Sequence, residues 1–311
     1  MRELALIVAV LAAFLCAPWL TDSGVVLNFL IMVLFATLLG QAWNILGGYG
    51  GQFSFGHAAF FGTGAYAMAV LQTVFAVNPW LALPLAILCG VLVALVIGVL
   101  SFRYGLRGSY FALVTLAFAE VLRILANTFD FTGAGVGLQL PLREAAGNMQ
   151  FADKTGYLYL VLSFVAFGLM LSWWLRHSRY GAWLSAVRDN EASALALGID
   201  ALRVKLAAIM LSAALMAAAG AFYLQYFHYI DPHIAYGPAI SIEALVGAIV
   251  GGLGSVFGPL LGALVLHLLG EATRNLMGDL PGISLVVYGV VLVLIVMFIP
   301  RGLSGLFGRR A

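Results

Sequence analysis

Long apolar runs separated by short polar stretches occupy the sequence from one end to the other. A helix that spans a membrane needs about 20 mainly apolar residues, within a range of about 17–25. Ten runs approach that length, of which the eighth is the shortest: 4–20, 26–46, 54–74, 81–101, 109–127, 157–175, 205–227, 241–253, 257–273 and 284–300. The pattern therefore predicts about ten membrane crossings, or eight if residues 241–256 enter the membrane and return.

The composition agrees with this reading. Of 311 residues, 63% are hydrophobic and 9% are charged, whereas a soluble domain carries about 25% charged residues. So few charges cannot cover a soluble globule, and we expect an all-α, polytopic transmembrane helical bundle. The run at 4–20 has no clear small-x-small cleavage site and is predicted to be the first spanning helix rather than a signal peptide. Cys16 and Cys89 lie inside apolar runs, where a structural disulfide is not expected.

The positions of lysine and arginine predict the orientation, because cytoplasmic loops carry an excess of these residues. With the N-terminus inside, Arg143, Lys154 and Arg274 fall outside and Arg123 lies within a helix. The other eleven of the fifteen cations then fall inside: Arg2, Arg103, Arg107, Arg176, Arg179, Arg188, Arg203, Lys205, Arg301, Arg309 and Arg310. We therefore expect both termini in the cytoplasm, a long outward loop at 128–156 that forms a small cap, and a long cytoplasmic loop at 176–204.

The cytoplasmic loop contains a short predicted helix, EASALAL, at 191–197. Asp189 suits its N-cap, Glu191 places a negative charge in the first turn, and Gly198 suits the position after its end. Two turns of helix are marginal in isolation, because nucleation is costly. The segment therefore needs a surface to pack on, which can be the protein's own helix ends or a groove in a partner subunit.

A glycine-rich stretch, GGYGGQFSFGHAAFFGTGAY, lies between two apolar runs at 47–66. Gly47 and Gly51 form a small-xxx-small pattern, which permits close helix packing. Alternatively, the glycines interrupt a helix and leave polar side chains facing a cavity, since irregular backbone at membrane depth must be buried in protein or line a water-filled space. The second reading makes the segment a candidate translocation pathway: Gly50, Gly51, Gln52, Phe53, Ser54, Phe55, Gly56 and His57.

A weaker copy of this pattern, GGLGSVFGPLLGA, occurs at 251–263. Both stretches contain a glycine pair followed by Phe-Gly, although the spacing between them differs. Glycine-interrupted segments in the two halves of a chain are typical of a transport pathway at a repeat interface. We therefore predict a weak internal repeat and add Gly252 and Gly254 to the candidate pathway.

Several ionisable side chains are predicted to lie at membrane depth. Glu120 and Arg123 are three residues apart on one helix and can partly neutralise each other. Glu120 is a further candidate for the pathway. Two roles remain open for Glu243, His267 and Glu271: structural pairing and transport. Intramembrane charges are costly and serve both purposes.

The sequence does not indicate an enzyme. Neither of its two lysines, Lys154 and Lys205, follows the glycine spacing of a phosphate-binding loop. We also find no spacing typical of a catalytic carboxylate pair, a Ser-His-Asp triad or a Cys-His pair. His228, Asp231 and His233 share an outward turn without the spacing of a closed metal site. We expect no catalytic residue, metal or cofactor in this chain, and no nucleic-acid partner.

Four segments, at 44–66, 106–125, 186–200 and 251–263, together resemble the permeases of branched-chain amino-acid ABC transporters, in particular their M-type subunit. They occur in the family's order, and the likeness runs from about residue 28 to residue 305. The resemblance implies one transmembrane permease domain over residues 1–311, located in a bacterial inner membrane. It also implies a high-affinity importer for leucine, isoleucine and valine that works by alternating access.

The resemblance further implies a set of partners. These are a second, related permease, two cytoplasmic ATPases that bind ATP and Mg, a periplasmic substrate-binding protein and the lipid membrane. The segment at 186–200 matches the family's coupling loop, with Ser193 where the usual Glu-Ala-Ala pattern has its second alanine. The coupling residues implied are Arg188, Asp189, Asn190, Glu191, Ala192, Ser193, Leu195 and Gly198. Urea, short amides or another small polar solute remain alternative cargo, and a stand-alone secondary transporter is the rival class.

Overall fold

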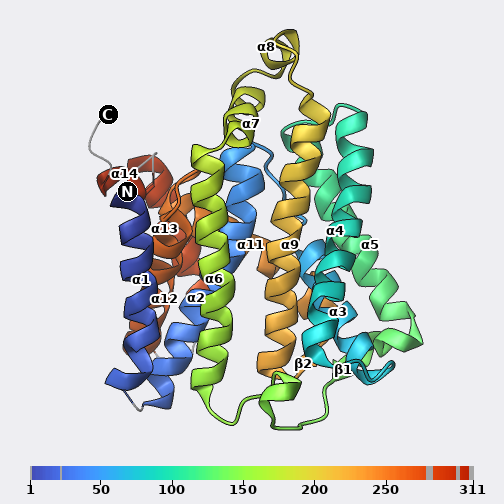
Figure 1. Cartoon of the computed structure of the whole chain (residues 1–311), viewed down its shortest axis with the longest axis vertical. Coiled ribbons are helices and arrows are strands. Elements are labelled where there is room, and N and C mark those ends of the chain that lie inside the picture. The colour runs from blue at the N-terminus through green and yellow to red at the C-terminus, as the bar shows by residue number, and fades with distance from the viewer. Residues whose placement is uncertain (1, 22, 278–282, 299–301, 308–311) are drawn as a thin grey trace.

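The apolar runs form long helices that lie side by side in the computed structural model of the chain (Figure 1). The structure describes residues 2–21, 23–277, 283–298 and 302–307. Within these ranges, seven helical segments are long and apolar enough to cross a membrane. The chain is therefore an all-α polytopic bundle, as predicted, and the number of crossings stays a prediction.

The helix bounds follow the predicted runs closely. The helices are α1 (Arg2–Leu20), α2 (Gly24–Asn44), α3 (Ala58–Thr73), α4 (Pro79–Arg103), α5 (Ser109–Thr128), α6 (Lys154–His177), α7 (Arg179–Asp189), α8 (Glu191–Ala196), α9 (Ala201–Phe227), α10 (Pro232–Tyr236), α11 (Pro238–Gly251), α12 (Gly258–Met277), α13 (Ile283–Phe298) and α14 (Ser304–Phe307). A π-helical turn, η1 (Ile45–Tyr49), extends α2.

The interior of the bundle is formed by α2, α3 and α9, with Trp43, Phe60 and Phe222 among its largest buried side chains. Helices α3 and α9 approach closely because glycine faces backbone at their contact. A Cβ atom at Gly64 of α3 would collide with the backbone of Ala217 of α9. Such close contacts between small residues are the usual means of helix association in membranes.

The loop between α5 and α6, which is predicted to face outward, forms a cap at the end of the bundle opposite α8 (Figure 1). It contains three short 3₁₀ turns, η2 (Asp130–Thr132), η3 (Ala134–Val136) and η4 (Ala146–Asn148). Its two-residue strand β1 (Leu138–Gln139) pairs antiparallel with β2 (Tyr229–Ile230), which follows α9. The loop is thereby tied to the end of α9.

The loop at 176–204 is more helical than predicted. Helix α6 continues to His177, α9 begins at Ala201, and an unpredicted helix, α7, precedes α8. Helix α8 projects from one end of the bundle, and the start of α1 and α14 lie toward the same end (Figure 1). This arrangement agrees with a common side for the two ends, although Arg301, Arg309, Arg310 and the end of the predicted 284–300 span lie outside the described residues.

Two predicted spans need correction. Residues 54–57 of the predicted 54–74 span are not helical, and α3 begins only at Ala58, because the preceding glycines break the helix. The short run at 241–253 is the end of a longer span, Pro232–Gly251, made of α10 and α11 with a break at Gly237. The hydrophobic pattern missed its first part because prolines and a glycine interrupt that part.

Candidate functional site

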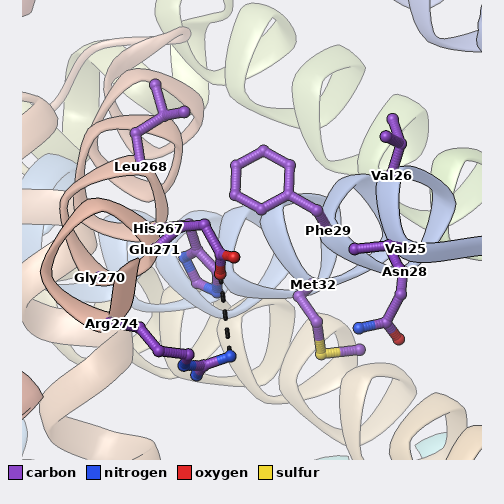
Figure 2. Close-up of a pocket in the computed structure, with 10 residues that line it drawn as sticks. All are labelled: Val25, Val26, Asn28, Phe29, Met32, His267, Leu268, Gly270, Glu271 and Arg274. Atoms are coloured by element: carbon purple, nitrogen blue, oxygen red, sulfur yellow. Dashed lines mark ion pairs between the residues drawn. The ribbon is translucent and has the colours of Figure 1, made fainter. Parts of the chain in front are cut away.

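Three ionisable residues of α12, His267, Glu271 and Arg274, line an open pocket beside the start of α2 (Figure 2). The pocket has a volume of about 530 Å³, and within it Arg274 Nη1 lies 3.8 Å from Glu271 Oε2. Its lining residues are Val25, Val26, Asn28, Phe29, Met32, His267, Leu268, Gly270, Glu271 and Arg274. The structure thus brings His267 and Glu271 together, with Arg274 as a counter-charge.

The predicted pair on α5 is present. Arg123 Nε donates to Glu120 Oε2 at 2.8 Å, and the side chains of Glu120 and Arg123 are 52% and 23% exposed. Glu120 therefore lies on an outer face of the single chain and is neutralised by its own helix. In this it differs from the buried polar residues of the glycine-rich stretch.

The glycine-rich stretch is a break between two helices. After η1 the chain leaves the helical conformation at residues 50–57 and becomes helical again at Ala58. The side chains of Gln52, Ser54 and His57 are buried within the protein (8%, 0% and 0% exposed). By contrast, Phe53 and Phe55 are 40% and 41% exposed.

Neighbouring helices supply hydrogen bonds to this non-helical backbone. Trp43 Nε1 donates to the carbonyl oxygen of Ser54 at 2.8 Å, and Ser54 Oγ donates to Thr115 Oγ1 at 3.2 Å. Gly56 packs so closely on Thr115 that a Cβ atom would collide with its carbonyl oxygen. Unpaired backbone groups inside a membrane are costly. These contacts therefore stabilise the break in a defined conformation.

His57 anchors the end of the break to the core. Its Nε2 lies 2.9 Å from Ser212 Oγ, and Ser212 Oγ donates to the carbonyl oxygen of Ala42 at 2.6 Å. Since the single hydroxyl hydrogen of Ser212 is used on Ala42, Nε2 of His57 carries the hydrogen that joins the two side chains. His57 is thus held by α9 and α2 together.

The two glycine-rich segments meet at Asn44, the last residue of α2. Its amide nitrogen donates to the carbonyl oxygen of Ser255 at 3.0 Å, and its Oδ1 accepts from the backbone N–H of Gly254 at 2.8 Å. Gly252 and Gly254 have positive φ angles of 117° and 68°, which glycine adopts without strain. The predicted repeat segments therefore form a pair of helix breaks in direct contact.

Arg188 links the loop at 176–204 to the first helix break. Its Nη1 donates to the carbonyl oxygen of Gly48 at 3.1 Å, and its Nε donates to Asp189 Oδ1 at 3.0 Å. Its aliphatic stem lies against Gly51, where a Cβ atom would collide with Arg188 Cγ. Gly51 also has a φ of 64°. Residues predicted for two different roles, coupling and translocation, are therefore in contact.

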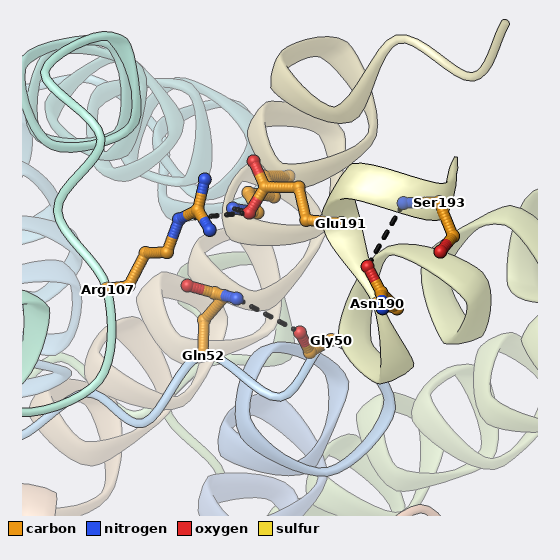
Figure 3. A network of polar contacts seen from close by, with 7 residues as sticks. Gly50, Gln52, Arg107, Asn190, Glu191 and Ser193 are labelled. Atoms are coloured by element: carbon orange, nitrogen blue, oxygen red, sulfur yellow. Dashed lines mark hydrogen bonds and ion pairs between the residues drawn. The ribbon is translucent and has the colours of Figure 1, made fainter. Parts of the chain in front are cut away.

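Glu191 fixes α8 to the bundle. Its Oε2 lies 2.6 Å from Lys205 Nζ of α9 and 3.2 Å from Arg107 Nε of the turn before α5 (Figure 3). The side chains of Lys205 and Glu191 are only 4% and 18% exposed. Nearby, the Gln52 amide donates to the carbonyl oxygen of Gly50 at 3.3 Å (Figure 3). Glu191 therefore faces inward and positions α8.

The ends of α8 are capped by its own sequence, with one correction. The N-cap is Asn190, whose Oδ1 accepts from the backbone N–H of Ser193 at 3.0 Å. The prediction of Asp189 is wrong because α7 extends through Asp189 and only Asn190 has extended backbone. Gly198 ends the helix with a φ of 82°, and its N–H donates to Leu195 at 2.9 Å, as predicted for a C-terminal glycine.

The opposite face of α8 is open. Ala194 is buried, whereas Leu195 and Leu197 are 54% and 81% exposed, and Ala192 and Ser193 are also exposed. At the base of the loop, Tyr180 Oη donates to the carbonyl oxygen of Val204 at 2.8 Å, and burial raises the pKa of Tyr180. The loop is therefore fixed to α9, with an apolar tip available for protein contact.

Sequence reasoning missed the partners of these residues. Lys205 and Arg107 hold Glu191, and Asn44 joins the two breaks. Two of them carried a signal: Lys205 is one of two lysines, and Asn44 is a polar residue three positions before the glycine cluster in an apolar run. No local pattern indicated Arg107 or Thr115, whose partners are distant in sequence.

A family model described as the permease component of branched-chain amino acid transport systems matches residues 25–296. The chain belongs to this family. Over 321 residues it is 28% identical to the high-affinity branched-chain amino acid transport system permease protein LivM of Escherichia coli K12, covering 96% of this chain and 74% of LivM. This confirms the predicted family and its likeness to the M-type subunit.

Two further relatives agree. The permease is 28% identical over 265 residues to the probable branched-chain amino acid transport permease protein LivH of Methanocaldococcus jannaschii, covering 78% of this chain and 79% of that protein. It is 23% identical over 284 residues to the permease protein BraD of Pseudomonas aeruginosa, covering 86% and 91%. With its apolar helices, this places the permease among multi-pass inner-membrane proteins.

Proposed function

We propose that this permease is one of two related subunits that form the membrane channel of an ATP-driven importer for branched-chain amino acids. Two cytoplasmic ATPases that bind ATP and Mg drive it, and a periplasmic binding protein delivers the substrate. Escherichia coli K12 has two permeases similar to this chain, LivM and LivH, which supports a pair of different permeases.

The observation that carries the proposal is the construction of α8. Its inner side is fixed by the ion pairs of Glu191, while Leu195 and Leu197 are exposed at the tip of the bundle. A helix of six residues has little stability of its own, so this anchoring supports a role as a rigid contact. An apolar tip on a helix that is anchored in this way suits docking in a groove of an ATPase.

The contacts that attach α8 to the bundle support alternating access. A push on α8 acts on α9 through Glu191 and Lys205, and on the first helix break through Arg188 and Gly48. The second break follows through Asn44 and Gly254. Helix breaks of this kind allow small rigid-body shifts of the flanking helices, which supports a route that opens to one side at a time.

Uptake of labelled leucine in a strain that lacks only this chain tests the proposal. We expect uptake to be lost in that strain, restored by the wild-type chain, and inhibited by excess isoleucine or valine but not by urea. Inhibition by urea alone would instead indicate a permease for urea or short amides.

The stand-alone secondary transporter is tested by purification. We expect the permease to co-purify with a second permease and two soluble ATPase subunits, and uptake to require ATP. Full uptake in vesicles that contain this chain without ATPase subunits would overturn the proposal.

A further inference from the structure

A cavity of about 320 Å³ lies between α11 and α12, next to α2. Its walls are mainly apolar, with Ala36, Ile242, Val246 and Leu266 among the lining residues. Two ionisable side chains, Glu243 and His267, line it as well. Cavities that bind small ligands are typically apolar with a few placed polar groups, from about 300 Å³ upward, and this cavity fits that description.

The two ionisable groups offer hydrogen-bond acceptors. His267 Nδ1 lies 3.1 Å from the carbonyl oxygen of Ala263, and because a carbonyl only accepts, Nδ1 carries the hydrogen. The Nε2 atom of the neutral ring is then an acceptor. Within the described part of the chain, Glu243 makes no hydrogen bond or ion pair. A carboxylate and an imidazole lone pair together suit a donor with several hydrogens, such as an ammonium group.

The start of α11 faces the same cavity through Pro238 and Ala239. This helix of 14 residues begins after the break at Gly237, which supplies no side-chain cap. The N-terminus of a helix carries a partial positive charge and favours carboxylates. Discontinuous helices with such ends are found at substrate sites in membrane transporters.

We infer that this cavity is a binding site for a zwitterionic aliphatic amino acid on its way through the permease. Glu243 and His267 accept from the ammonium group, the first turn of α11 lies toward the carboxylate, and the apolar walls contact the side chain. An unpaired carboxylate inside a membrane is costly and is most often functional, which this ligand explains. The inference rests on the proposed function, since it assigns a substrate site within the same importer.

Cysteine labelling tests occupancy of the cavity. Gly247 lines it, and a Cβ atom there would meet no described atom within 4 Å, so Gly247→Cys suits a reporter in a Cys16→Ser/Cys89→Ser background. In cells that express the assembled transporter, we expect saturating leucine to slow alkylation by a small maleimide at least threefold. Normal leucine uptake with no change in the alkylation rate would overturn the inference.

Substitution of the carboxylate gives the second test. Loss of a hydrogen bond to a charged group corresponds to roughly tenfold in affinity, so Glu243→Gln should raise the KM for leucine about tenfold and remove the protection at Gly247→Cys. Glu144→Gln, the same substitution at an exposed residue of the loop between α5 and α6, is the control and should keep the wild-type KM. An unchanged KM in Glu243→Gln contradicts the inference.

The two proposals fail differently. If the wild-type chain restores no leucine uptake, the proposed function itself is wrong. If the wild type transports leucine and the Gly247→Cys and Glu243→Gln variants respond no differently from their controls, only the site assigned to the cavity is wrong. If Glu243→Gln does not reach the membrane, the labelling experiment on Gly247→Cys with native Glu243 still tests whether leucine occupies the cavity.

Discussion

Arg188 Nη1 donates a hydrogen bond to the carbonyl oxygen of Gly48 across 140 positions of sequence, at 3.1 Å. Arg188 lies near the end of α7, just before α8, and Gly48 lies in the π-helical turn that ends α2. The bond therefore joins the end of α7, which leads into α8, to a helix break inside the bundle. The carbonyl oxygen of Gly48, which accepts this bond, belongs to a π-helical turn. The bond can therefore stabilise the conformation in which that turn ends.

Substituting Gly51 should disturb this link. Gly51→Ala places a Cβ atom against the stem of Arg188 at a φ of 64°, so both strain and a collision are expected. Gly105→Ala is the matched control, with a φ of 69° but no described atom within 4 Å of the added Cβ. Each should lose about 1–2 kcal/mol of stability from backbone strain, whereas only Gly51→Ala should lose most of its leucine uptake. Equal uptake in the two variants would show that the Arg188 contact is unimportant.

Removal of Glu191 and removal of Lys205 should lower the stability of the protein by different amounts. Glu191→Ala leaves Lys205 buried without a counter-charge, which costs about 3 kcal/mol or more. Lys205→Met should cost less, because Glu191 retains Arg107 at 3.2 Å. Thermal unfolding of the purified transporter measures the order, and the double variant should lie nearer to Lys205→Met. A less stable Lys205→Met than Glu191→Ala would contradict the inward role of Glu191.

The exposed tip of α8 should matter for assembly and not for folding. Leu195→Asp places a charge on a side chain that is 54% exposed, so stability should change by about 0.5 kcal/mol or less. A charge in an apolar docking groove is costly, and co-purification of the ATPase subunits should fall at least tenfold. Leu142→Asp, at a side chain 69% exposed in the loop between α5 and α6, is the control and should retain them. Normal retention by Leu195→Asp would reject docking at this tip.

Much of the fold was predictable because membrane helices are set by length and hydropathy. Helices α4 and α5 match their predicted runs within two residues at each end. The predictions failed where local chemistry competes with hydropathy. Residues 54–57 of the predicted 54–74 span belong to the helix break, and the span that ends in α11 has an interrupted start, although both lie in apolar sequence. Helix α7 was missed because it is held by contacts such as that of Tyr180 with Val204, which no local pattern encodes.

The candidate residues were predictable as segments and less so in their roles. Capping preferences identified Gly198 correctly, because the position after α8 has a positive φ, which favours glycine. The same preferences wrongly predicted Asp189 as the N-cap in place of Asn190. The sequence left two readings of the glycine-rich stretch open, close helix packing or polar side chains facing a cavity. In the structure, Ser54 and His57 are bonded to neighbouring helices. Those partners lie far away in sequence, so only the tertiary structure reveals them. Contact of these residues with a substrate stays a prediction.

We propose that Arg188 passes movement from the ATPases to the helix breaks. The ratio of leucine transported to ATP hydrolysed tests this most directly. The ratio is measured in liposomes that contain the assembled transporter, for the wild type, Arg188→Ala and the control Arg203→Ala, whose exposed side chain pairs only locally with Asp200 within the described residues. Loss of a charged hydrogen bond corresponds to roughly tenfold. We predict that Arg188→Ala keeps basal ATP hydrolysis but lowers the ratio about tenfold, while Arg203→Ala leaves it unchanged. A wild-type ratio in Arg188→Ala would contradict the account.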